Sequence, residues 1–211
     1  MKILFIHQNF PAQFKFLAPA LVNKGYDISC FTISKDIKNK IKGVNYIPCM
    51  ITRSSTKNIH PWIADLETKT IRGEAYFRTA DKLKKQGFFP DLIIAHPGWG
   101  ESLFLKEVWP SSKLAIYCEF FYHAQGYDVG FDPEFPVSDI TNSCRLKLKN
   151  VNNILHLPQA DAGISPTKWQ ASSFPKVFQK KIKVIHDGID TQSLIPDSSV
   201  KMTLDAGLEL T

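Results

Sequence analysis

Short apolar runs alternate along this chain with longer segments in which apolar residues recur at the spacing of a helix. The runs that predict β-strands are 2–6, 26–33, 43–47, 91–95, 113–118, 162–165 and 182–185. The segments that predict helices are 10–22, 61–86, 101–108, 139–157 and one that starts at 166. Apolar strands separated by helices are typical of a parallel sheet covered on both faces. The pattern therefore predicts an α/β fold with a doubly wound, mainly parallel sheet of about six or seven strands.

The loop after the first strand is predicted to lead directly into a helix. Asn9 is the expected N-cap, Pro11 suits the first turn, and Gly25 ends the helix. Pro19 falls inside this helix, where we expect a kink or an early frayed end. Because the first N–H groups of a helix have no partner within it, this loop is expected to favour an anion such as a phosphate.

Polar side chains follow four of the predicted strands. His7, His96 and His186 each stand at a strand's carboxyl end, and Glu119 follows the strand at 113–118. In an open parallel sheet, ligands bind just beyond this edge, so the four side chains predict a cleft. The alternative for each of them is an ordinary turn residue, and for His186 the two interpretations remain equally open.

Two stretches near this edge carry most of the candidate chemistry. Residues 96–101 (HPGWGE) combine two glycines, two titratable side chains and a large aromatic within one turn. Residues 119–136 form a long segment without periodicity that is rich in aromatic and acidic side chains. A loop of this length within a compact domain is usually functional or disordered, and its aromatic content argues against disorder.

Charge narrows the choice of partners. The net charge is +6 and the pI is near 9.1, with lysine clusters at 35–42, 82–85 and 176–183. These clusters indicate either an anionic partner, such as a phosphorylated substrate or an anionic membrane surface, or simply solvated faces, which we favour. They are not interleaved with stacking aromatics, so no nucleic acid is expected. With neither a signal peptide nor a membrane-spanning run in the sequence, we expect a cytoplasmic protein whose membrane contact would be peripheral, at the inner face.

Several enzyme classes are disfavoured by missing motifs. The chain contains no G-x-G-x-x-G dinucleotide fingerprint, no lysine-bearing phosphate loop, no G-x-S-x-G elbow and no H-E-x-x-H helix. Its four cysteines and six histidines show no metal-ligand spacing, and the cysteines suit a reduced protein. No metal and no cofactor are therefore predicted, and a nucleotide-dependent oxidoreductase is disfavoured.

The motifs that remain resemble the N-terminal domain of bacterial family 4 glycosyltransferases of the GT-B fold, in the group that opens with H-Q-N-F-P. The matching stretches are 7–14 (HQNFPAQF), 17–21 (LAPAL), 95–106 (AHPGWGESLFLK), 119–136 (EFFYHAQGYDVGFDPEFP), 160–170 (ADAGISPTKWQ), 174–175 (FP) and 184–191 (VIHDGIDT). The resemblance covers almost the whole chain in order. Ala12, where glycine is more usual, and Gln13 mark a small departure.

This resemblance implies one half of a GT-B enzyme, in which two Rossmann-like domains face each other. Residues 1–190 would be the acceptor-side domain and 191–211 a linker start or tail. The glutamates show no E-x(7)-E pair, the donor motif of the family's second domain, so the donor-binding domain is expected to be absent or separate. The implied reaction transfers a sugar from a nucleotide-sugar donor to a glycan or lipid-linked acceptor with retention. The alternative is a non-catalytic module that binds glycans or a partner.

The resemblance also implies roles for individual residues. His96 would hydrogen-bond the transferred sugar, and Glu101 would bind an acceptor hydroxyl or assist proton movement. The residues that would face the donor phosphates are His7, Gln8, Asn9, Phe10, Pro11 and Gln13. Those that would contact the acceptor are Gly98, Trp99, Gly100, Glu119, Phe121, Tyr122, Asp132 and Glu134. The hinge and cleft wall would include His186, Asp187 and Gly188.

Overall fold

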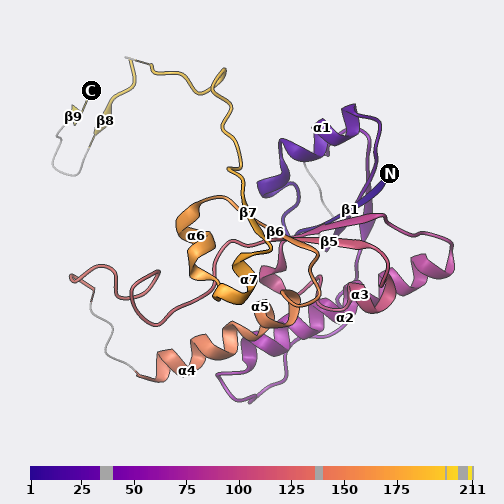
Figure 1. The fold of residues 1–211 in the computed structure, drawn as a ribbon, viewed down its shortest axis with the longest axis horizontal. Coiled ribbons are helices and arrows are strands. Elements are labelled where there is room, and N and C mark those ends of the chain that lie inside the picture. The colour runs from indigo at the N-terminus through magenta and orange to yellow at the C-terminus, as the bar shows by residue number, and fades with distance from the viewer. Residues whose placement is uncertain (34–39, 136–139, 198, 204–208, 211) are drawn as a thin grey trace.

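A computed structural model describes residues 1–33, 40–135, 140–197, 199–203 and 209–210. Its main feature is a seven-stranded, all-parallel sheet in the order β3-β2-β1-β4-β5-β6-β7 (Figure 1). The strands are β1 Lys2–Ile6, β2 Asp27–Thr32, β3 Val44–Pro48, β4 Leu92–Ala95, β5 Lys113–Tyr117, β6 Ala162–Ser165 and β7 Ile182–Val184. The predicted doubly wound α/β sheet and its seven strands are confirmed, with boundaries that differ by one or two residues. After β7 the chain runs away from the sheet, and β8 Met202–Thr203 pairs with β9 Glu209–Leu210 in this tail.

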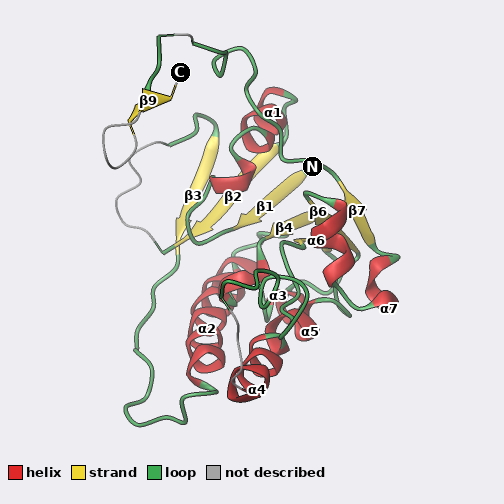
Figure 2. Ribbon diagram, turned by 90° about the vertical axis from the view of Figure 1, so that its left-hand side faces the viewer, coloured by secondary structure: helices red, strands yellow, loops and turns green. Residues whose placement is uncertain are grey.

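The helices cover the two faces of the sheet unequally (Figure 2). They are α1 Leu17–Asn23, α2 Ala64–Lys85, α3 Leu105–Val108, α4 Ile140–Lys149, α5 Val151–His156, α6 Lys168–Ser173 and α7 Lys176–Gln179, with short 3-10 turns η1 Ala12–Phe14 and η2 Pro97–Trp99. On one face lies α1, whereas α2, α3, α4 and α5 lie on the other. Within the described residues, no helix is long and apolar enough to cross a membrane.

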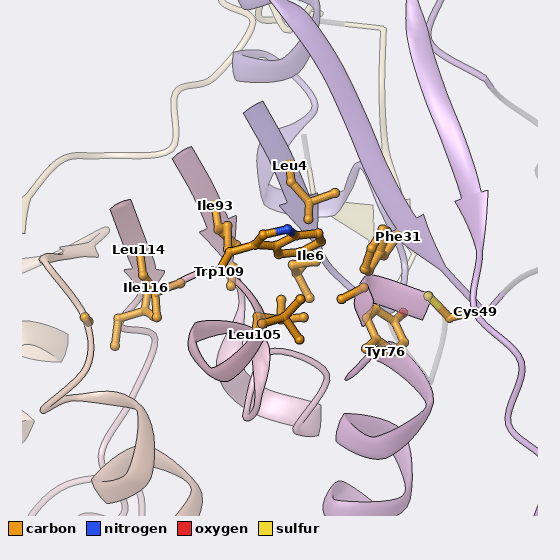
Figure 3. Close-up of a cluster of buried hydrophobic side chains, with 14 of the residues drawn as sticks. Leu4, Ile6, Phe31, Cys49, Tyr76, Ile93, Leu105, Trp109, Leu114 and Ile116 are labelled. Atoms are coloured by element: carbon orange, nitrogen blue, oxygen red, sulfur yellow. The ribbon is translucent and has the colours of Figure 1, made fainter. Parts of the chain in front are cut away.

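The core follows from the alternation of side chains along the strands. Leu4 and Ile6 point to the α2 side of the sheet, where they join Phe31, Tyr76 and Trp109 in one buried cluster (Figure 3). The rings of Phe31 and Trp109 lie 6.4 Å apart, centroid to centroid. Each side chain of this size that leaves water stabilises the fold by about 2 to 3 kcal/mol. The other face holds a second cluster beneath α1.

The predicted start of the first helix was wrong. The chain turns at Pro11, forms η1, and begins α1 only at Leu17, so Asn9 does not cap a helix. Pro19 explains the shift, because it occupies the first turn of α1, where a missing N–H removes no intrahelical bond. No kink is needed there, and the loop after β1 is not followed directly by an α-helical N-terminus.

The predicted helix at 139–157 is two helices, α4 and α5, separated at Asn150. At this break the Asn150 side chain accepts a hydrogen bond from the Tyr122 backbone N–H (2.9 Å) and donates one to the Tyr122 carbonyl (2.7 Å). The break therefore holds the long segment after β5 in place. Pro136, the predicted end of this segment, and Asp139, the predicted start of the helix, lie outside the described part of the chain, as do Lys35 and Lys38 of the first lysine cluster.

Candidate functional site

Adjacent strands bring two of the predicted histidines together at the carboxyl edge of the sheet. Ile6 pairs with Ala95 across β1 and β4, so the residues that follow them, His7 and His96, are neighbours. Their ring centroids lie 5.1 Å apart, and both residues are 98% buried, with 2% of their surface exposed. The Trp99 ring lies 4.7 Å from that of His96 and 5.0 Å from that of His7.

Tyr117, at the end of β5, completes this group by stacking on His96 with a centroid distance of 5.4 Å. We call His7, His96, Trp99 and Tyr117 the ring cluster. The Tyr117 hydroxyl donates a hydrogen bond of 2.7 Å to Asp187, which follows β7. The ring cluster thus joins the ends of β1, β4 and β5 to the chain after β7.

Hydrogen bonds on both ring nitrogens fix the orientation of His96. Its Nδ1 accepts a bond from the Gly98 backbone N–H (3.2 Å), and its Nε2 lies 3.2 Å from a carboxylate oxygen of Glu119. Because Nδ1 accepts, the neutral ring carries its proton on Nε2 and donates it to Glu119. This hydrogen bond from His96 holds the pKa of Glu119 below its usual value. Half of the Glu119 side chain is exposed, so the pair presents a carboxylate to the surface.

His7 is held in a similar way, with the Gln13 side chain as the neighbour of its second ring nitrogen. Its Nδ1 accepts a hydrogen bond from the Asn9 backbone N–H (2.9 Å). Burial, and then the neighbouring His96, lowers the pKa of His7 to about 4, so the ring is neutral and carries its proton on Nε2. The Gln13 side chain lies beside the ring and opposes this lowering of the pKa, and the buried Nε2 of His7 and Oε1 of Gln13 form no other hydrogen bond among the described residues.

Glu101 lies behind the ring cluster rather than on an open surface. It is fully buried, and one carboxylate oxygen is 3.2 Å from Arg72 Nη1 of α2. The same Arg72 nitrogen contacts the side-chain oxygen of Gln8. Burial raises the pKa of Glu101, and its second oxygen has no partner among the described residues. Arg72 therefore links α2 both to Glu101, in the turn after β4, and to Gln8, in the loop after β1.

A narrow pocket opens beside the His96–Glu119 pair, which we call the cleft pocket. Its volume is about 20 Å³, which admits little more than one water molecule. Its lining residues are Lys69, His96, Pro97, Gly98, Tyr117, Glu119, Phe120, Tyr122, Lys149, Asn152 and Asn153. Of the predicted acceptor residues, Gly98, Glu119 and Tyr122 lie here.

Other predicted site residues lie elsewhere. Phe10 is in the core beneath α1, and Phe121 packs against Phe174 with a ring distance of 5.9 Å. Asp132 and Glu134 lie in a surface turn, where the Asp132 side chain accepts a hydrogen bond from the Glu134 backbone N–H (2.9 Å). Neither of these two residues lines the cleft pocket.

His186 and Asp187 line a separate apolar pocket of about 380 Å³. Its other walls include Gln13, Phe14 and Phe16, from the segment before α1. The Gly188 backbone N–H donates a hydrogen bond to His186 Nδ1 (3.0 Å), so this turn repeats the one at His96. The pocket lies beside the ring cluster, because Tyr117 also lines it.

Sequence reasoning missed most of the residues that line the cleft pocket, among them Lys69, Tyr117, Lys149 and Asn152. Tyr117 was assigned to a strand, where its position next to Cys118 gave no sign that its hydroxyl reaches the cleft edge. The other three come from helices α2, α4 and α5, and which helix face meets a strand end depends on tertiary packing. In the sequence, only their residue types, two lysines and an asparagine, could have indicated a binding role. Within the described residues, no three His, Cys, Asp or Glu side chains form a group that could hold a metal ion.

Three solved structures share the fold of this chain at low sequence identity. Sucrose-phosphate synthase from Thermosynechococcus elongatus matches with a TM-score of 0.54 and 16% identity, over 90% of this chain and 91% of that chain. Os79 from O. sativa in complex with UDP matches with a TM-score of 0.55 and 10% identity, over 88% of this chain and 51% of that chain. The catalytic domain of starch synthase IV from Arabidopsis thaliana, bound to ADP and acarbose, matches with a TM-score of 0.51 and 14% identity, over 91% and 52% of the two chains.

At such low identities these similarities show the fold, which is that of a GT-B half domain. The chain spans about half the length of Os79 and of starch synthase IV. No curated protein sequence matches this chain. The model of the glycosyl transferase family 4 group matches residues 26–194, most of the chain. The protein therefore belongs to the glycosyl transferase family 4 group.

Proposed function

We propose that this chain is the acceptor-side half of a retaining glycosyltransferase, with residues 1–190 as the domain and 191–211 as linker or tail. It would transfer a sugar from a nucleotide-sugar donor to a glycan or lipid-linked acceptor. The observation that carries this proposal is the buried His96, oriented by Gly98 and Glu119 at the carboxyl edge of the sheet, beside a pocket.

In the proposed chemistry, His96 and Glu119 contact the transferred sugar and the acceptor, whereas His7 and Gln13 face the donor phosphates. During transfer, the bond between the sugar and the nucleoside diphosphate breaks as the acceptor oxygen attaches, negative charge develops on the departing diphosphate, and that group takes up the proton of the acceptor hydroxyl. When the donor binds, the Nε2–H of His96 would exchange its hydrogen bond to Glu119 for one to the transferred sugar, and the half-exposed Glu119 carboxylate would then accept a hydrogen bond from the acceptor hydroxyl. The Nε2–H of His7, with the Gln13 side chain beside it, would face the donor phosphates.

Glu101 is better suited to a supporting role than to direct contact with the acceptor. Its carboxylate is fully buried and paired with Arg72, which also contacts Gln8. We propose that this network holds the loop after β1 against α2 and so keeps His7 and Gln8 in place. Groups held rigidly before the substrate binds need no reorganisation in the transition state.

Two surface features support the proposed need for a donor-binding domain. The apolar pocket lined by His186 and Asp187 is open beside the ring cluster. The tail after β7 carries exposed apolar side chains, among them Ile189, Leu194 and Ile195, each more than 60% exposed. Exposed apolar groups in one region typically mark a surface that packs against another. We also propose that the protein is cytoplasmic and that its net charge of +6 favours peripheral contact with an anionic membrane.

Complementation tests this proposal. The 211-residue chain would be assayed with UDP- and ADP-sugars, alone and together with a separately made C-terminal domain of a family 4 glycosyltransferase. We expect sugar transfer only from the mixture. Robust transfer by the chain alone would contradict the half-enzyme proposal. If a panel of matched C-terminal domains never produces transfer, the chain is instead the non-catalytic binding module.

A further inference from the structure

The wall of the cleft pocket away from β4 contains two lysines in unlike surroundings. Lys69 of α2 is 94% buried, with 6% of its surface exposed, and its ammonium lies 2.7 Å from a carboxylate oxygen of Asp65. Lys149 of α4 is partly buried, and its Nζ lies 3.7 Å from the centre of the Tyr122 ring. Among the described residues, no carboxylate forms an ion pair with Lys149. In the pocket wall, the charge of Lys69 is therefore balanced by a carboxylate, whereas the charge of Lys149 contacts only an aromatic face.

The acidic groups around this wall already have other partners. Glu119, across the pocket, pairs with His96, and Asp65 pairs with Lys69. Asp128 is a more distant electrostatic neighbour of Lys149, and its carboxylate is 3.4 Å from the His123 backbone N–H. Burial, and then Lys69, lowers the pKa of Lys149, to which Arg145 also contributes. An anion that entered the pocket would offset this unfavourable environment.

Asn152 of α5 offers the complementary group for a hydroxyl. Its Nδ2 donates a hydrogen bond of 2.6 Å to the Pro97 carbonyl, which fixes the amide so that Oδ1 is the remaining atom. Asn152 is 98% buried, with 2% of its surface exposed, and lines the pocket, yet Oδ1 has no partner among the described residues. A buried carbonyl oxygen without a donor is costly, so a ligand hydroxyl would be a favourable partner.

We propose that the cleft pocket binds an acidic sugar as the acceptor. Lys149, with Lys69 behind it, would hold an anionic group, a carboxylate or a phosphate, and Asn152 Oδ1 would accept a hydrogen bond from a sugar hydroxyl. Because the pocket as it stands holds little more than one water molecule, the sugar would enter as the unbranched Lys149 side chain rotates off the Tyr122 ring. This inference rests on the proposed function and names the chemical class of its acceptor.

The test is an NMR titration of the 211-residue chain with glucuronate, glucose 6-phosphate, glucose and inorganic phosphate. We expect at least one of the two acidic sugars to bind about tenfold more tightly than glucose, as a charge-assisted hydrogen bond would give. Lys149→Gln should reduce that preference to within about twofold. Lys147→Gln, at an exposed lysine on the same helix, should leave it unchanged. Preference for one of the two acids identifies the anionic group as carboxylate or phosphate.

Equal affinity for glucose and both acids, or no binding of either acid, would overturn the inference. So would binding of inorganic phosphate as tight as that of glucose 6-phosphate, because the sugar would then contribute nothing. A thermal melt of each variant ensures that lost preference is not lost folding. These outcomes are separate from the proposed function, since the titration needs no turnover. Charge preference in a chain that no C-terminal domain activates would refute only the proposed function.

Discussion

His96 is the residue around which the candidate site is arranged. The Gly98 N–H and the Glu119 carboxylate engage its two ring nitrogens, and Trp99 and Tyr117 pack on its ring. The sequence predicted His7, His96 and Glu119 correctly as neighbours at one sheet edge, because the carboxyl ends of parallel strands meet there. It did not predict that Glu101, five residues after His96, points into the protein, because a turn's side-chain directions depend on what packs against it.

Acid should destabilise the protein through His7. Its folded pKa is about 4, below the ordinary value of 6.5, so the unfolded chain binds a proton more readily than the folded one. Stability should therefore be fully present above pH 6.5 and fall as the pH is lowered toward 4. Between pH 7 and pH 5 we expect a loss of about 2 kcal/mol from this group, measured by urea unfolding.

His7→Asn isolates this contribution, because the Asn oxygen can replace Nδ1 as the acceptor for the Asn9 N–H. His156 is also buried with a pKa lowered to about 4, but it contributes equally in both proteins. The loss between pH 7 and pH 5 should be about 2 kcal/mol smaller in the variant. An unchanged loss would show that His7 is not protected from protonation in the folded state.

Arg72 should matter more to stability than its partly exposed position implies. Arg72→Met would leave the Glu101 carboxylate buried and unpaired, which costs about 3 kcal/mol of unfolding free energy at pH 7. Chemical denaturation measures this cost, and it should shrink at pH 5, where Glu101 can take up a proton. Arg78→Met, at a largely exposed arginine on the same helix paired with Glu74, should change stability by less than about 0.5 kcal/mol. Equal costs for the two variants would contradict the buried Arg72–Glu101 pair.

At the scale of elements, the contact between α2 and the 96–101 turn sets the shape of the site. Gly100 has a φ of +90°, and a Cβ built there would lie 2.4 Å from the Lys69 carbonyl oxygen. Gly73 of α2 faces the same turn, since its Cβ would lie 2.9 Å from the Gly100 carbonyl oxygen. Glycines on both sides therefore let the helix and the turn approach each other closely.

Gly100→Ala should separate these elements. We expect a loss of at least about 3 kcal/mol, from the left-handed backbone and from the backbone clash together. Gly87→Ala is the matched control, because its φ is +86° but nothing lies within 4 Å of the added Cβ. The control should lose only about 1 kcal/mol. Thermal unfolding of both proteins compares them, and similar losses would show that α2 can move away from the turn at little cost.

The sequence predicted β1 at its observed bounds and α2 to within three residues of its bounds. The first helix was misplaced, because Pro11 and Pro19 both suit a first turn and the sequence offers no means of choosing between them. The division of 140–156 into α4 and α5 was also missed, since it depends on Asn150 bonding to Tyr122, a residue 28 positions away. Local patterns identify an element, but such distant contacts decide where it ends.

At the scale of the whole molecule, polar side chains lie at the carboxyl edge of the sheet, and exposed apolar side chains lie in the tail after β7. Composition and the order of elements were sufficient to predict the doubly wound fold. They could not place Lys69, Lys149 and Asn152 opposite His96, because those contacts arise only when three helices pack on one face of the sheet. The acceptor class that we infer therefore depends on the tertiary structure.

The central claim is that sugar transfer takes place at His96. The most direct test measures turnover of the chain joined to a C-terminal donor domain, comparing wild type with His96→Ala, and His60→Ala as a control at an exposed histidine. Loss of a general acid–base or orienting group typically costs on the order of a hundredfold or more, so the His96 variant should lose well over tenfold in kcat while melting within a few degrees of wild type. His60→Ala should turn over normally. Near-normal turnover by a folded His96→Ala enzyme would contradict the account.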